Sequence, residues 1–141
     1  MVYFAHTDFF KYFLYFSKKG KFQDKNKLLK NMLEDLLKIP KNKLIIPTYN
    51  YDFPNTRIYN VKKDLSQVGS FSEYFRKKYL NSRSLIPMFS TCNSIKNLNF
   101  KYKKNFIDPF GQRAEFAYLV KTKGKILSFG SRFGPSFIIY I

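Results

Sequence analysis

The sequence predicts an α/β fold: a layered α/β/α domain with a mixed central sheet, formed by residues 1–141 as a single domain. Short apolar segments alternate along the chain with segments whose apolar residues recur at three- and four-residue spacing. This alternation is typical of strands that alternate with helices. With 141 residues, of which 45% are hydrophobic, the chain is long enough to bury one core.

The first strand and the first two helices follow from the amino-terminal third of the chain. The apolar start "MVYFAH" suits a strand, and Thr7 or Asp8 can cap the helix that follows it. The clearest helix covers residues 26–40 and is ended by Pro40. Its apolar residues have the spacing of one helix face: Leu28, Leu29, Met32, Leu33, Leu36 and Leu37.

Two further strands are expected in the middle of the chain. The segment "KLIIPTYNY", residues 43–51, reads as a buried strand in which Pro47 marks the end or a sheet edge. Residues 52–66 read as a loop. The segment "SLIPMFSTC", residues 84–92, predicts a strand that Pro87 interrupts.

Two more helices separate these strands from the carboxyl-terminal part. Residues 70–80, "SFSEYFRKKYL", predict a helix that begins with Ser70 and Glu73 at the spacing of a capping box. Residues 114–121, "AEFAYLVK", predict a short helix that ends before Gly124.

The carboxyl-terminal part adds a long loop and two strands. Residues 93–113 are polar and basic and read as a loop, whereas residues 125–130 and 136–141 read as strands. The last strand is apolar up to Ile141, and such a strand needs sheet neighbours and cover. We therefore expect a fold that is incomplete at its carboxyl end, as in the amino-terminal part of a longer protein.

The chain is strongly basic. It has 26 Lys and Arg residues against 9 acidic residues, a formal net charge of +17. Such a charge attracts anions, including phosphates, acidic lipids and nucleic acid. The basic residues are spread along the chain, apart from the small clusters "SKKGK" and "NFKYKKN". A solvated lysine surface explains this pattern better than a nucleic-acid interface, so nucleic acid is not the expected partner.

Cysteine content and hydropathy limit where the protein is expected. Cys92 is the only cysteine, which rules out a disulfide within the chain and fits a reducing compartment. It follows an apolar run, so we expect a buried structural thiol. The amino terminus lacks the features of a signal peptide, and no stretch reaches about 20 apolar residues. We therefore expect a cytoplasmic protein without a membrane partner or a metal site.

An ordered set of segments resembles the aminoglycoside 3-N-acetyltransferase family, also called the antibiotic N-acetyltransferases. The matching segments cover nearly the whole chain, and the block "LSQVGSFSEYFRKK", residues 65–78, is the most specific of them. The others are "FAHTDFFKYF" (4–13), "KLIIPTYNYDF" (43–53), "RSLIPMFS" (83–90), "DPFG" (108–111) and "GKILSFGSRFGPSFIIYI" (124–141).

The resemblance implies transfer of an acetyl group from acetyl-CoA to an amine of an aminoglycoside or another amino sugar. The family's cofactor-binding elements match His6, Thr7, Thr48, Tyr49, Ser66, Val68 and Gly69 in this sequence. A helix that begins near Ser70 can offer free N–H groups to an anion. For Ser66 and Ser70, simple helix capping is the alternative, and for His6 it is a structural role.

Arg83 and Asp52 are the substrate-binding candidates. A guanidinium group can bind a phosphate or a carboxylate through two hydrogen bonds, although Arg83 could also form a surface ion pair. Asp52 lies in a matched loop, where a solvated carboxylate is the alternative. Asp8 departs from the family pattern, in which a neutral or basic residue commonly lies nearby, and its carboxylate would repel a phosphate of the cofactor.

The resemblance also implies that no catalytic position is intact. The histidines of the family's active-site segments correspond to Ile86, Phe89 and Ile139 in this sequence. An amine must lose a proton before it attacks a thioester, and none of these side chains can accept one. We therefore expect an inactive homologue, with three alternatives: an enzyme completed by a partner chain or a missing carboxyl-terminal part, an inactive CoA-binding protein, and a nucleic-acid-binding basic protein.

Overall fold

The computed structural model describes residues 1–21, 24–38, 43–98 and 108–130 of the chain. Within these residues the fold is α/β, as predicted, and is built around a four-stranded sheet with strand order β3-β2-β1-β4. The strands are β1 (Val2–Thr7), β2 (Lys43–Pro47), β3 (Thr91–Asn93) and β4 (Lys125–Phe129). Strands β2 and β4 both run parallel to β1, whereas β3 runs antiparallel to β2, so the sheet is mixed.

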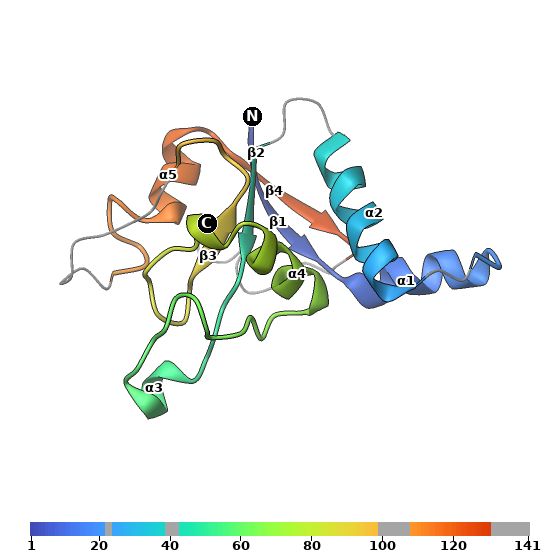
Figure 1. Cartoon of the computed structure of the whole chain (residues 1–141). Coiled ribbons are helices and arrows are strands. Elements are labelled where there is room, and N and C mark those ends of the chain that lie inside the picture. Colours follow the sequence, from blue (N-terminus) through green and yellow to red (C-terminus); the bar gives the residue numbers. More distant parts are fainter. Residues whose placement is uncertain (22–23, 39–42, 99–107, 131–141) are drawn as a thin grey trace.

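Helices connect the strands and cover both faces of the sheet (Figure 1). Helices α1 (Phe9–Lys18) and α2 (Lys25–Lys38) lie between β1 and β2 in the sequence. Helices α3 (Phe53–Thr56) and α4 (Ser70–Lys78) and the 3₁₀ turn η1 (Leu80–Ser82) lie between β2 and β3. Helix α5 (Glu115–Lys121) precedes β4.

Two apolar clusters show the three layers. On one face, Ala5, Leu44 and Ile46 of the sheet pack against buried residues of α2 and α4. On the other face, Phe4 and Ile45 pack against Phe116 and Leu119 of α5. Neighbouring residues of β1 and β2 therefore point to opposite faces, as the period of a strand requires.

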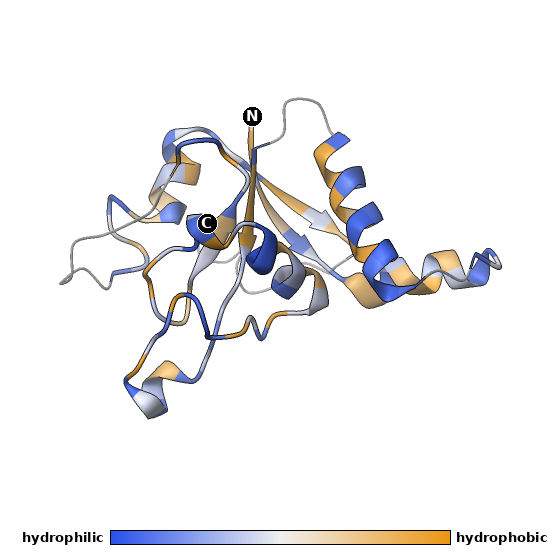
Figure 2. Ribbon diagram, viewed as in Figure 1, coloured by the Kyte–Doolittle hydropathy of each residue, from blue (hydrophilic) through white to orange (hydrophobic). Residues whose placement is uncertain are grey.

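Helix α2 shows how the sequence pattern produces this packing. Leu28, Leu29, Met32, Leu33 and Leu36 are buried, whereas Leu37 is 38% exposed. Figure 2 shows the apolar side of α2 turned toward the sheet. The Asp24 carboxylate accepts hydrogen bonds from the backbone N–H groups of Asn26 and Lys27, which satisfies donors at the start of the helix.

Two of the expected elements need correction. The strand predicted at residues 84–92 is a strand only from Thr91, because Met88 adopts a left-handed φ of 64° directly after Pro87 and the segment turns there. The loop predicted at residues 52–66 contains the short helix α3, which has Pro54 in its first turn, where proline is tolerated.

The other described helices and strands agree with the predictions within one or two residues, apart from the strand predicted at residues 43–51. That strand, β2, ends at Pro47, one of the two roles predicted for this proline. The predicted helix end at Pro40 and the predicted strand at residues 136–141, including Ile139, lie outside the described residues. None of the helices in the described ranges is long and apolar enough to cross a membrane.

Candidate functional site

A groove lies at the end of the sheet where the parallel strands β1, β2 and β4 have their carboxyl ends. It consists of two adjoining cavities of about 830 and 550 Å³ that share Lys25, Gly69 and Ser70. The larger is also lined by Thr7, Asp8, Phe9, Phe10, Lys11, Phe13 and Val68. The smaller is also lined by Asn26, Leu29, Ser66, Gln67, Glu73, Tyr74 and Lys77.

The groove brings together four of the predicted cofactor-binding residues. Thr7 comes from the end of β1, and Ser66, Val68 and Gly69 come from the segment before α4. These two segments are 59 residues apart in the sequence, counted from Thr7 to Ser66. Carboxyl ends of parallel strands are the usual place for ligands in α/β sheets.

The other three predicted cofactor-binding residues do not line the groove. His6 points to the face of the sheet opposite Thr7, and its ring lies 5.2 Å from that of Phe4. Burial lowers the pKa of His6, so the neutral imidazole is favoured. Thr48 is fully buried, and Tyr49 is buried with Phe4 and Phe116.

The amino ends of α1, α2 and α4 border the groove. Asp8 caps α1, because its side chain accepts a hydrogen bond from the Lys11 backbone N–H at 3.1 Å. Its ion pair with the Lys11 ammonium group measures 3.7 Å. Asp8 thus has a structural role in starting α1.

The amino end of α4 differs from the predicted capping box. Gly69, with φ of 119°, is the N-cap, and no side chain caps the helix. Ser70 is the first helical residue, so the prediction that it caps α4 is wrong. A Cβ atom at Gly69 would meet no atom within 4 Å, which means that the groove is open directly beside the helix start.

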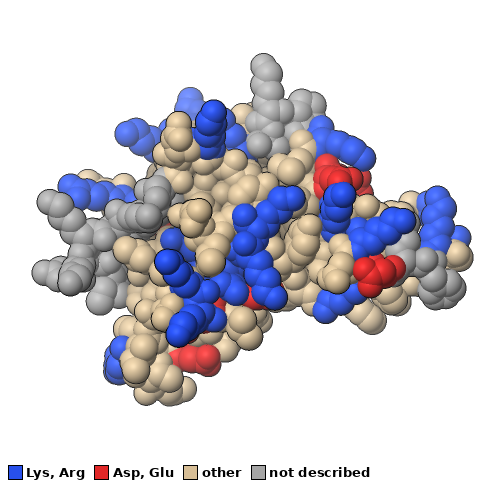
Figure 3. All heavy atoms as spheres, viewed as in Figure 1, with Lys and Arg blue, Asp and Glu red and all other residues tan. Residues whose placement is uncertain are grey.

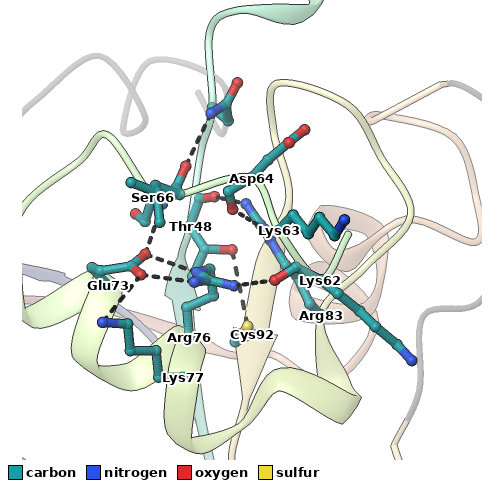
Figure 4. Close-up of polar contacts among 12 residues, drawn as sticks. Thr48, Lys62, Lys63, Asp64, Ser66, Glu73, Arg76, Lys77, Arg83 and Cys92 are labelled. Atoms are coloured by element: carbon teal, nitrogen blue, oxygen red, sulfur yellow. Dashed lines mark hydrogen bonds and ion pairs between the residues drawn. The ribbon is translucent and has the colours of Figure 1, made fainter. Parts of the chain in front are cut away.

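Glu73 supports the segment in front of α4. Its carboxylate accepts a hydrogen bond from the Ser66 backbone N–H at 2.8 Å and two from Arg76, each at 2.7 Å (Figure 4). Burial alone would raise the pKa of Glu73, but these hydrogen bonds and the charges of Arg76 and Lys77 hold it below its usual value. The Ser66 hydroxyl is buried and has no hydrogen-bond partner within the described ranges.

Arg83 is 1% exposed, so the alternative of a surface ion pair is wrong. Its guanidinium donates to the carbonyl oxygens of Thr48 at 2.9 Å, Val61 at 3.0 Å and Asp64, and to the Ser90 hydroxyl at 3.3 Å. These bonds tie the end of β2 and the loop before α4 to one buried side chain. Arg83 does not line the groove.

Asp52, the other substrate-binding candidate, is exposed and accepts a hydrogen bond from the Gln67 side chain at 3.0 Å. Gln67 in turn accepts from the Tyr51 backbone N–H at 2.7 Å. The contact joins the loop that contains Asp52 to the segment before α4, next to the groove.

Ile86 and Phe89, which the resemblance aligned with histidines, are part of the packing. Ile86 is 1% exposed, and the Phe89 ring lies 5.4 Å from Tyr49 and 5.9 Å from Phe110. Cys92 is fully buried, as predicted, and burial raises its pKa to about 11. No group of three metal-ligating side chains occurs among the residues that the structure describes.

Sequence reasoning missed Lys11 and Lys25 in the groove and Arg76 behind it. Arg76 could have been found, because it follows Glu73 by three residues and such neighbours meet on a helix. The two lysines carry no such signal, since only the tertiary fold places them in one groove. Comparisons with protein-family models, curated proteins and solved structures found no match.

Proposed function

We propose that the groove binds CoA or acetyl-CoA and that this chain by itself does not transfer the acetyl group. The observation that carries the proposal is the meeting of an uncapped helix start, at Gly69 and Ser70, with Lys11 and Lys25 in one groove. The predicted cofactor-binding residues Thr7 and Val68 line the same cavity.

The chemistry of this lining fits the phosphates of CoA. Backbone N–H groups at the start of α4 and the helix dipole favour an anion, and the Lys25 ammonium group adds a positive charge, whereas the charge of Lys11 is offset by Asp8. Phe9, Phe10 and Phe13 supply an apolar wall on the α1 side, which suits the less polar parts of the ligand. The Asp8 carboxylate opposes anion binding but is paired with Lys11.

We expect no acetyl transfer because the residues at the positions predicted to accept a proton from the amine cannot do so. In the family that the sequence resembles, an amine of an amino sugar attacks the thioester after it loses a proton. Ile86 and Phe89 cannot accept that proton; Ile86 is buried, and Phe89 packs against an apolar cluster. Burial lowers the pKa of His6, but its ring lies on the other face of the sheet from the groove. A partner chain that supplies the base would be needed for turnover.

Calorimetric titration of the whole chain with CoA tests the binding. Lys25→Glu should weaken CoA binding by roughly tenfold, about 1.4 kcal/mol. Lys27→Glu is the matched control, because Lys27 is exposed in the same first turn of α2 but does not line the groove. Pantetheine, which lacks the phosphates, should bind far more weakly than CoA. Equal losses in both variants, or no CoA binding at millimolar concentration, would contradict the proposal.

Release of free thiol from acetyl-CoA in the presence of a panel of amino sugars tests the second part. We expect no release above that in buffer. Turnover that disappears in the Lys25→Glu variant and persists in Lys27→Glu would show that the chain is an active enzyme.

A further inference from the structure

The fold gathers lysines that the sequence keeps apart. Lys62 and Lys63 lie in the turn before α4, and Lys77 and Lys78 lie in its last turn. All four are exposed. We call these four residues the α4 lysine patch. Figure 3 shows Lys and Arg side chains gathered over α4 and the loop in front of it.

Buried arginines hold the two parts of the patch together. Arg76, 4% exposed, donates from its guanidinium to the Lys62 carbonyl oxygen at 2.9 Å. Arg83 donates to the carbonyl oxygens on either side, at Val61 and Asp64. The turn is further fixed by Asn60, whose side chain accepts from the backbone N–H groups of Lys62 and Lys63. Figure 4 shows Lys62, Lys63 and Lys77 arranged around Arg76.

The carboxylates beside the patch are engaged by neighbouring groups of the fold. Glu73 accepts two hydrogen bonds from Arg76 and one from Ser66, and the Lys77 ammonium lies 3.9 Å away as a further neighbour. The Asp64 side chain accepts from the Asn60 backbone N–H at 2.8 Å. With Arg76 included, five positive charges face two negative ones, a local excess of +3.

We propose that the α4 lysine patch binds the phosphate backbone of nucleic acid without reading its sequence. Exposed ammonium groups on a fixed turn and helix end act as point charges for phosphates, and neutralising phosphates releases counterions. A membrane surface fits less well, because an interfacial helix presents an apolar face beside its lysines, whereas α4 buries Phe71 and Phe75 in the core. The patch meets the groove only at Lys77, which lines the smaller cavity, whereas Lys62, Lys63 and Lys78 do not line the groove.

Fluorescence anisotropy with labelled single-stranded and double-stranded 20-nucleotide probes, over a series of salt concentrations, tests this inference. The variants K62A/K63A and K77A/K78A each remove two charges from the patch. The control K121A/K125A removes two exposed charges, one at the end of α5 and one at the start of β4. Circular dichroism checks that each variant is folded.

Each patch variant should weaken binding of a single-stranded probe about tenfold and reduce the slope of log K against log salt by about 1.4, two contacts at 0.7 each. The control should change affinity less than about twofold. Three results would overturn the proposal: no binding at low salt, equal losses in all three variants, or binding to vesicles with anionic lipid but not to either probe.

Discussion

At the residue scale, the predicted and observed roles differ most for Arg83. It was expected to hold a substrate anion, and in the fold its donors serve four acceptors of the protein. Burial lowers its pKa, but the carbonyl groups around it still favour the cation. The Tyr59 ring lies 5.4 Å from the guanidinium carbon and adds a cation–π contact.

Replacing Arg83 should therefore destabilise the protein strongly. Arg83→Leu removes a donor from three carbonyl groups, of which that of Thr48 keeps the Ser90 hydroxyl, and we expect it to lower the free energy of unfolding by about 3 kcal/mol. Arg83→Lys keeps a charge but cannot span all four acceptors, so it should lie between leucine and wild type. Urea unfolding followed by circular dichroism measures both. A loss below about 0.5 kcal/mol for Arg83→Leu would show that the network contributes little.

Glu73 predicts a pH dependence with a definite sign. Its pKa in the folded protein lies below the ordinary value of 4.5, so its stabilising effect is present above that value and is lost as the pH falls. The difference in unfolding free energy between wild type and Glu73→Gln should be largest near about pH 7 and should shrink steadily as the pH falls below the ordinary pKa of 4.5. Urea unfolding of both proteins across this range checks it, and a difference that grows toward low pH would reverse the sign.

At the element scale, the spacing of apolar residues predicted which faces are buried, whereas the conformation of irregular segments depends on individual polar contacts. The leucine spacing of α2 identified its buried face because that helix buries one side, whereas β1 is apolar because it buries both sides, Phe4 on one and Ala5 on the other. The segment at residues 84–90 looked like a strand because it is apolar. It is irregular because Ser84, Arg83 and Ser90 make polar contacts with other segments that no periodicity encodes.

The groove too could be predicted only in part from the sequence. Thr7, Val68 and Gly69 could be expected there from the family resemblance, but Lys11 and Lys25 could not, because their meeting depends on how α1 and α2 leave the sheet. His6 and Thr7 are neighbours in sequence, and the resemblance assigned both to one site. The alternation of β1 places them on opposite faces, which a strand period applied to this pair would have predicted.

The start of α1 offers a test that separates folding from binding. Asn caps a helix about as well as Asp, so Asp8→Asn should change the unfolding free energy by less than about 0.5 kcal/mol, whereas Asp8→Ala should lower it by about 1 kcal/mol. Because Asp8→Asn removes a negative charge from the groove, it should also strengthen CoA binding several-fold. Unfolding curves and calorimetric titration measure the two effects. Weaker CoA binding to a stable Asp8→Asn variant would contradict the proposed groove function.

At the scale of the whole molecule, the placement of the carboxylates shapes the surface. Asp8, Asp24, Asp64 and Asp108 accept hydrogen bonds from nearby backbone N–H groups, and Glu73 holds Arg76. Acidic residues are thus used to start helices and turns, while most lysines remain exposed. The formal net charge of +17 does not prevent folding, because the core contains few charged groups. The exposed positive charges nevertheless repel one another.

This self-repulsion predicts that salt stabilises the protein. Exposed charges more than a Debye length apart are largely screened, and that length falls from about 30 Å at about 0.01 M salt to below about 10 Å above about 0.1 M. Raising sodium chloride across this range should therefore increase the melting temperature by about 3 to 6 °C, equivalent to one or two kcal/mol for a chain of this length. Differential scanning fluorimetry measures the change. The K62A/K63A variant carries two fewer charges, so its melting temperature should respond less to salt than that of wild type or of a neutral control such as Ser17→Ala. A melting temperature that falls with salt would mean that specific ion pairs outweigh the net repulsion.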